Sequence, residues 1–145
     1  MKRIILILFL IVMLAGGWYA YKIYTGKVPS LTDVKSEEKI DAISLIAAFE
    51  KDSASANKKY LGKILEVSGT IKTIDKGSAA IALGNTESSS SVRCTMDSAF
   101  VKAIEGLKKG APITIKGACT GFLPDETGLG LGSDVVLNRC VIEMK

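Results

Sequence analysis

Three cysteines carry the most distinctive chemistry in this chain of 145 residues, which contains no histidine. Cys119 and Cys140 fall in the last two predicted strands, which a single loop connects. Because strands joined in this way pair antiparallel, a hairpin centred in the loop lets the two thiols face each other. We therefore predict a disulfide between them in an oxidising compartment, where it would stabilise the fold by about 3 kcal/mol. The alternative is two small apolar side chains in the core.

The third cysteine, Cys94, lies between Val92 and Met96 on the apolar face of another predicted strand. We expect it to be a buried free thiol. A zinc site made of three thiolates is disfavoured, because the cysteines lie on separate strands and the chain has neither a C-x-x-C pair nor a histidine. We therefore predict no metal site and no cofactor.

Catalytic patterns are weak in this chain. Without histidine, Ser–His, Cys–His and His–metal mechanisms are excluded. Ser55 begins an S-x-x-K sequence, but the S-D-N and K-T-G motifs that accompany it in enzymes are absent. The glycine-rich residues 128–132 precede no predicted helix, as a dinucleotide-binding loop requires. The spacing of Asp125, Glu126 and Asp134 matches no calcium-binding loop. We expect no enzymatic activity and predict no catalytic residues.

Five predicted strands position these residues, because apolar and polar side chains alternate along them. They cover residues 63–74, 78–83, 92–97, 112–122 and 134–143. Gly69 permits a sharp bend in the first strand, and Ser98 caps a predicted helix after the third. This order predicts a mainly β fold, a five-stranded OB-fold Greek-key barrel over about residues 63–143 with a helix between strands 3 and 4. The alternative is an open α+β sheet.

One extra helix is predicted in front of the barrel. Ser36 caps this helix, and an apolar face runs from Ile40 to Phe49. Together with the barrel it forms one predicted domain over residues 36–145. Residues 22–35 lack periodicity and are predicted to be a linker.

The N-terminal part is an uncharged run of 18 residues from Ile4 to Tyr21. As a helix it would be roughly 27 Å long, close to the thickness of a bilayer core. Ile4 and Leu10 would lie in the hydrocarbon, and Trp18 and Tyr21 at the interface. We therefore predict an N-terminal transmembrane signal anchor over residues 1–21.

Two alternatives to the anchor remain. The small residues 15–17 suit cleavage of a signal peptide, but the run continues past them through bulky aromatic side chains. A buried core helix leaves Lys2 and Arg3, a targeting pattern, unexplained. These cations favour a cytoplasmic N-terminus. We predict a single-pass membrane protein whose C-terminal domain is exported to the periplasm or the cell surface.

The charge of the chain gives little support to nucleic-acid binding. Its formal net charge is +4, and Lys2 and Arg3 of the anchor contribute two of these charges. The exported part is therefore nearly neutral, unlike a dedicated nucleic-acid-binding domain. The predicted strands 78–83 and 92–97, where OB folds bind and stack bases, contain no aromatic residue.

A candidate binding surface combines a small group of cations with the predicted loop of residues 123–133. Its residues are Lys72, Lys76, Arg93, Lys116, Phe122, Asp125 and Glu126. The two acidic residues would repel phosphate, so nucleic acid is a disfavoured partner. We expect the membrane as a partner through the anchor, and an envelope protein or a small or carbohydrate ligand at this surface.

Several segments of the chain carry a family resemblance. They are residues 56–63 with 65–69, 92–94, 107–110, 113–117 with 119–122, and 134–142. In these segments the chain resembles the bacterial tRNA-anti-like OB-fold family of small membrane-anchored or lipoprotein domains. The resemblance implies an OB fold and, by analogy with anticodon-binding domains, nucleic-acid binding. We predict a non-catalytic, membrane-anchored OB-fold binding module of the cell envelope, with an oligonucleotide-binding domain as the alternative.

Overall fold

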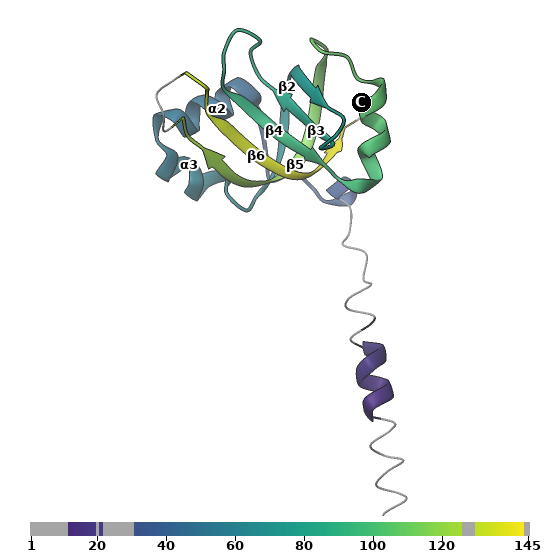
Figure 1. Cartoon of the computed structure of the whole chain (residues 1–145). Coiled ribbons are helices and arrows are strands. Elements are labelled where there is room, and N and C mark those ends of the chain that lie inside the picture. Colours follow the sequence, from purple (N-terminus) through teal and green to yellow (C-terminus); the bar gives the residue numbers. More distant parts are fainter. Residues whose placement is uncertain (1–11, 20, 22–30, 126–129, 144–145) are drawn as a thin grey trace, which may run out of the picture.

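A computed structural model describes residues 12–19, 21, 31–125 and 130–143 of the chain (Figure 1). Over the last two of these ranges, six strands pack with two α-helices and two 3-10 helices. The strands are β1 (Glu38–Asp41), β2 (Ile64–Asp75), β3 (Ala80–Leu83), β4 (Ser91–Met96), β5 (Pro112–Leu123) and β6 (Asp134–Ile142). The helices are η1 (Leu31–Asp33), α2 (Ala42–Lys51), α3 (Ser53–Tyr60) and η2 (Ser98–Gly106).

Five of the strands close into a barrel. Hydrogen-bonded neighbours follow the order β2–β3–β4–β6–β5, and pairing of β2 with β5 completes the ring. Strands β4 and β6 run parallel, whereas the other four pairs in the ring are antiparallel. This is the topology of the OB fold, a five-stranded Greek-key barrel. The predicted barrel is confirmed, and the structure is not an open α+β sheet.

The segment before the barrel differs from the helix that the sequence predicts from Ser36 onward. Residues 38–41 form β1, which pairs in parallel with β2. Helix α2 begins only at Ala42, where the carboxylate of Asp41 accepts hydrogen bonds from two backbone N–H groups. The Ser36 hydroxyl instead donates to Glu66. The predicted cap was wrong because β1 gains backbone hydrogen bonds from β2, and the helix starts where this pairing ends.

Helices α2 and α3 pack against one end of the barrel, on the left in Figure 1. The buried face of α2 includes Leu45, Ile46 and Phe49. The Phe49 ring lies 6.0 Å from that of Tyr60 in α3 and stacks 5.0 Å from that of Phe122 in β5, between ring centroids. Each large apolar side chain buried in this way contributes about 1.5–3 kcal/mol to folding. The extra helices therefore extend the core of the barrel.

The barrel interior is filled by alternate residues of the strands, as their period-two pattern predicts. Its fully buried side chains include Leu65, Val67, Ile71, Ile81, Leu83, Val92, Ile115, Val135 and Leu137. A Cβ on Gly69 of β2 would lie 2.9 Å from the Cβ of Ala42. The glycine therefore lets α2 begin directly against the strand.

The connection between β4 and β5 contains η2, so the helix predicted between strands 3 and 4 is present as a 3-10 helix. Asp97, rather than the predicted Ser98, caps it, because the Asp97 carboxylate accepts a hydrogen bond from the N–H of Ala99. Ile104 is buried, and Phe100 packs partly buried against the core. The helix thus covers the barrel with its apolar face.

Residues 12–19 of the N-terminal part are helical, and Trp18 and Tyr21 are exposed. Among the residues that the structure describes, no helix combines the length and apolarity needed to cross a membrane. The predicted anchor residues Ile4 and Leu10 lie outside the described residues.

Candidate functional site

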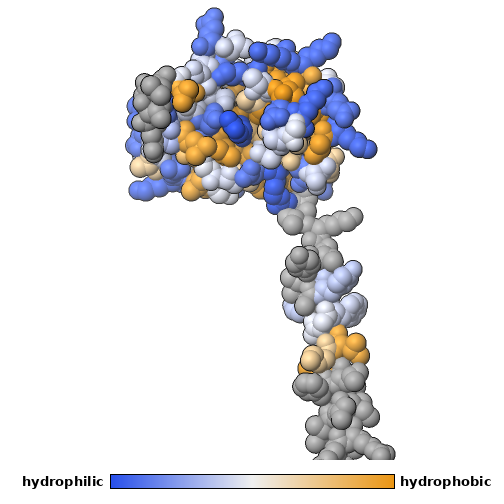
Figure 2. Space-filling model, viewed as in Figure 1, coloured by the Kyte–Doolittle hydropathy of each residue, from blue (hydrophilic) through white to orange (hydrophobic). Residues whose placement is uncertain are grey.

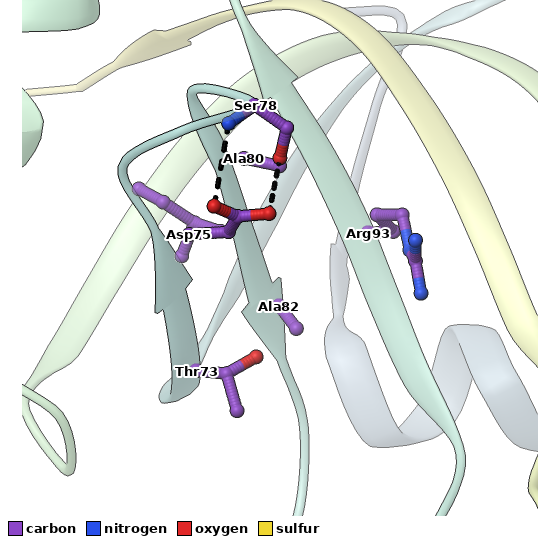
Figure 3. A pocket seen from close by; sticks show the side chains of 7 residues that line it. Thr73, Asp75, Ser78, Ala80, Ala82 and Arg93 are labelled. Carbon is purple, nitrogen blue, oxygen red and sulfur yellow. Dashed lines mark hydrogen bonds between the residues drawn. The ribbon is translucent and has the colours of Figure 1, made fainter.

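The outer face of β2, β3 and β4 carries a shallow groove of about 180 Å³ (Figure 3). Two cross-strand rows of side chains form it. In one row Thr73 lies opposite Ala82, which lies opposite Arg93, and in the other Asp75 lies opposite Ala80. Because successive residues of a strand point to opposite faces, these side chains face outward while their neighbours fill the barrel.

Asp75 forms one wall of the groove at the β2–β3 turn. Its carboxylate accepts hydrogen bonds from the Ser78 hydroxyl (2.6 Å) and the Ser78 backbone N–H (3.3 Å) (Figure 3). It also accepts one from the backbone N–H of Gly77 (2.9 Å). These bonds, led by that from the Ser78 hydroxyl, lower the pKa of Asp75 below its ordinary value of 3.8, and Arg93 adds a smaller effect. The wall therefore presents a fixed, negatively charged acceptor at neutral pH.

Arg93 forms the opposite wall, beyond the alanines in Figure 3. Its Nη2 lies 2.9 Å from Oδ2 of Asp134 in β6, and its side chain remains 58% exposed. The Asp134 carboxylate also accepts a hydrogen bond of 2.5 Å from the Ser91 hydroxyl. A guanidinium has five N–H donors in a rigid fork, so this ion pair orients Arg93 and leaves donors for a ligand.

The groove thus places an acceptor wall and a donor wall on either side of a floor formed by Ala80 and Ala82 (Figure 3). None of the seven residues that line it is aromatic. It is smaller than the pockets that enclose drug-sized ligands, so it fits one unit of a larger ligand. On the face seen in Figure 2, hydrophilic and apolar side chains are interspersed rather than gathered into one extended patch.

Lys72, a residue of the predicted binding surface, supports a neighbouring loop. It is the extra residue of a bulge in β2, where the pairing with β3 shifts between Ile71 and Thr73. Its ammonium group donates to the backbone carbonyls of residues 88–90, with distances of 2.9 Å and 3.2 Å to the last two. The structure therefore places the charge of Lys72 on the β3–β4 loop.

Lys116, also predicted for the binding surface, is buried with 6% of its surface exposed. Its ammonium pairs with the carboxylate of Glu143 and donates to the carbonyl of Thr32 at 3.3 Å. It is covered because η1 packs against β5 and β6. The alternating pattern of β5 gave no sign of this cover, which comes from a segment outside the barrel.

The other predicted surface residues are distributed over three places. Lys76 is exposed in the turn that joins β2 to β3. Phe122 is partly buried against an aromatic ring of α2 and is not available for stacking. Asp125 is partly buried in the β5–β6 loop, and Glu126 lies outside the described residues. Of the predicted set, the structure brings Arg93 into the groove and Lys76 beside it.

A second polar cluster joins the β3–β4 loop to α2 and to the β5–β6 loop. The Ser90 hydroxyl donates to the Glu50 carboxylate (2.7 Å) and accepts from the N–H of Ser133 (3.1 Å). Lys72 bonds the backbone of the same loop. We call Glu50, Lys72, Ser90 and Ser133 the polar junction. It fixes the loops at one end of the β2–β4 face.

Sequence reasoning assigned no role to the serine run of residues 88–91. In the structure this run is held so closely that a Cβ on Gly132 would lie 2.3 Å from the carbonyl carbon of Ser89. Gly132 also has a φ of +83°, which other residues rarely adopt. A glycine in one loop and a serine run in another carry no shared signal in the sequence, so only the fold reveals this contact.

Comparison with known proteins adds the family. The family model described as tRNA_anti-like matches residues 1–140 of the chain. The chain belongs to the tRNA_anti-like family. No curated protein matches it. Among the solved structures that do match is a "putative nucleic acid-binding lipoprotein" from Klebsiella pneumoniae subsp. pneumoniae MGH 78578, with 20% identity and a TM-score of 0.55. The match covers 72% of this chain and 91% of that one, and at this identity it establishes the shared fold.

In this tRNA_anti-like domain, the segments that carry the family resemblance are points of barrel closure. The N–H of Gly110 donates to the carbonyl of Ile71, and the N–H of Gly62 donates to that of Cys119. A Cβ on Gly117 would lie 2.6 Å from Sγ of Cys140. The family pattern therefore specifies the fold, whereas the groove residues have to be judged by their own chemistry.

All three cysteines of the tRNA_anti-like domain are buried and reduced in the structure. The predicted Cys119–Cys140 disulfide is not formed, because the strand register pairs Cys119 with Leu137. A bulge in β6 at Arg139, whose φ is +56°, shifts the register before Cys140. The predicted pairing assumed a regular hairpin, which does not contain this extra residue. Cys94 is buried as well.

Proposed function

We propose that the protein is a non-catalytic binding module, tethered to a membrane, whose groove holds one unit of an uncharged, hydroxyl-rich ligand such as a glycan. The observation that carries this proposal is the pairing of an acidic wall with a basic wall across a floor of small side chains. Hydroxyl groups both donate and accept hydrogen bonds. One sugar ring can therefore donate to Asp75 while it accepts from Arg93.

The charges around the groove disfavour a polyanion. Asp75 contributes a negative charge to the groove itself, and Arg93 is already paired with Asp134. Lys72 and Lys116 are engaged by carbonyls and a carboxylate. Binding of nucleic acid depends on several cations that neutralise phosphates. This face offers few cations for that purpose.

The aromatic residues in the described part of the domain are also used elsewhere. Phe49 and Tyr60 are buried, and Phe100 and Phe122 pack against the same core. Strands β3 and β4 contain none of them. Because single-stranded nucleic acids are held largely by stacking of bases on aromatic rings, the face lacks the main contact of that binding mode.

Tethering to the membrane is supported by the apolar run from Ile4 to Tyr21, which has the length of a membrane-spanning helix. The match to the family begins at residue 1 and includes this run. Lys2 and Arg3 before the run favour export of the domain. The Klebsiella structure is described as a "putative nucleic acid-binding lipoprotein", and lipoproteins are attached to membranes. We therefore propose that the groove faces the cell envelope, where a glycan or another envelope component is its ligand.

Oligonucleotide binding is the second candidate function. The family description and the Klebsiella structure, described as nucleic acid-binding, favour it. It would use the same β2–β4 face, where OB folds bind oligonucleotides. The residues of this chain give it Arg93 and Lys76 as phosphate contacts and no stacking ring on β3 or β4.

A binding measurement on the full chain in detergent separates the two candidates. We expect N-acetylglucosamine oligosaccharides to bind, and single-stranded oligothymidylate not to bind at low salt. Ala82→Leu, which fills the groove floor, should weaken saccharide binding about tenfold or more, equivalent to about 1.4 kcal/mol. Ala118→Leu, on β5, is the matched control and should retain affinity. Oligothymidylate binding that Ala82→Leu abolishes would establish the second candidate instead.

A further inference from the structure

We propose that Cys94 and Cys140 form a disulfide between β4 and β6 when the domain folds in an oxidising compartment, while Cys119 remains a free thiol. This inference concerns the core rather than the groove. It rests on the proposed function only in that export supplies the oxidising compartment.

The topology brings these two cysteines to neighbouring strands. Strands β4 and β6 lie side by side and parallel, with Met96 opposite Cys140 and Cys94 opposite Leu137. Cys94 and Met96 share one face of β4, so Cys94 and Cys140 are diagonal neighbours inside the barrel. Both are fully buried. The bulge at Arg139 produces this arrangement, because it shifts the pairing of β6 before Cys140.

The two sulfur atoms have room to meet. The Cys94 and Cys140 thiols interact, because the proximity of Cys140 raises the pKa of Cys94. On its other side, Cys140 occupies the space beside Gly117, where a Cβ would lie only 2.6 Å from Sγ. Any larger residue at this position would push the Cys140 side chain away. The missing side chain at Gly117 of β5 therefore leaves space for the side chain of Cys140.

Cys119 also lies opposite Leu137 on β6, but it differs from Cys94 in what its sulfur contacts. The Cys119 thiol interacts with the backbone of Gly121, whereas the Cys94 thiol interacts with Cys140. Burial raises the pKa of its thiol, which lowers its reactivity once the chain is folded. The pKa of Cys94 is raised as well, by its contact with Cys140 and by burial. The bridge must therefore form during folding, before the core closes.

The reaction is an ordinary thiol–disulfide exchange. A thiolate of one cysteine attacks the disulfide of an oxidant, such as oxidised glutathione or an oxidoreductase, and forms a mixed disulfide. The second cysteine then attacks the sulfur of the first, and the S–S bond forms as the oxidant leaves as a thiol. The pair loses two electrons and two protons, and the oxidant disulfide gains them as two thiols.

Peptide mapping tests the assignment directly, because trypsin places each cysteine on a different peptide. Cleavage after Arg93 and Lys102 releases Cys94, cleavage after Lys116 and Arg139 releases Cys119, and Cys140 lies in the C-terminal peptide 140–145. The denatured full chain is refolded in detergent with reduced and oxidised glutathione, alkylated, digested without reduction and analysed by mass spectrometry.

We expect a linkage between the Cys94 and Cys140 peptides, with Cys119 alkylated. Cys119→Ser should keep this linkage, and the bridged protein should melt higher than its reduced form, by on the order of 10 °C. Three alkylated cysteines, or a linkage that contains Cys119, would overturn the proposal.

A second sample separates the failure of this proposal from the failure of export. Alkylation of intact cells before lysis reports the state of the cysteines in place. A bridge in the refolded protein with free thiols in cells supports the pairing and contradicts export to an oxidising compartment. A Cys94–Cys140 bridge in both samples supports both.

Discussion

The groove and the polar junction are built from similar residues and differ in what those residues contact. In the junction, Lys72 bonds backbone carbonyls, and Ser90 bonds both Glu50 and Ser133. In the groove, Arg93 has one carboxylate partner and a largely exposed side chain. Each cluster takes one residue from β2, Asp75 in the groove and Lys72 in the junction. Asp75 also has internal donors but stays exposed, so the exposure of a polar residue, and not only the number of its internal partners, decides whether a ligand can reach it.

This difference explains why residue type alone is a poor guide to the site. A lysine on a strand with an exposed pattern looks like a contact for an anion. Lys72 reaches a loop because a bulge aims it there, and Lys116 is covered by η1. Internal partners consume the hydrogen-bonding capacity that a ligand would otherwise use. The groove stands out because its floor is alanine and its walls remain accessible.

The largest effect should come from filling the contact between loops at the junction. Gly132→Ala places a Cβ 2.3 Å from the backbone of Ser89 at a residue with a φ of +83°. We expect it to lower the free energy of unfolding by about 3 kcal/mol. Gly130→Ala is the matched control, because Gly130 has a φ of +73° and open space around it. It should lower the free energy by only about 1 kcal/mol.

Urea denaturation of the two glycine variants measures this difference. Equal destabilisation would mean that strain of the backbone alone accounts for both, and that the loops are not held together as closely as the structure has them.

An intermediate effect should follow from loss of the cation that holds the β3–β4 loop. Lys72→Met removes the donor to the carbonyls of residues 88–90. We expect a loss of about 2 kcal/mol in urea denaturation, because bonds to a charged donor are stronger than neutral ones. Lys76→Met, four positions past the bulge in an exposed turn, should change stability by less than about 0.5 kcal/mol. Similar losses in both variants would contradict a special role for Lys72.

The smallest effect concerns the groove, where Asp75 has a lowered pKa because of Ser78 and the turn N–H groups. A lowered pKa in the folded state means that the charged carboxylate stabilises the fold. Its contribution is present above the ordinary pKa of 3.8 and is lost as the pH falls through the lower, folded value. The melting temperatures of the protein and of Asp75→Asn should therefore converge below about pH 3.8. A difference that is constant from pH 7 to pH 2.5 would disprove this linkage.

The barrel itself could be predicted from the sequence because each of its strands has one face in the core. Alternation located β2, β4, β5 and β6 to within one or two residues at each end. The short strand β1 was missed, because four residues with one apolar side chain carry no measurable period. Its pairing with β2 is a tertiary effect that local propensity does not contain.

The cysteine pairing and the site depended on irregularities that alternation does not encode. The extra residue at Arg139 decides which cysteine Cys140 can meet, and the bulge at Lys72 decides where that charge goes. The groove residues Thr73, Ala82 and Arg93 are adjacent only once the register of three strands is fixed. Their outward positions were visible in the sequence, but their partners across the sheet were not.

Residue-resolved NMR of the isotope-labelled full chain in detergent, titrated with N-acetylglucosamine oligosaccharides, tests whether the groove binds a glycan. We expect shifts of the amide signals of Thr73, Asp75 and Arg93, with little change at Ser90 and Ser133. Absence of shifts in the groove, or shifts confined to the polar junction, would contradict it. So would groove shifts produced by single-stranded oligothymidylate and not by the saccharide.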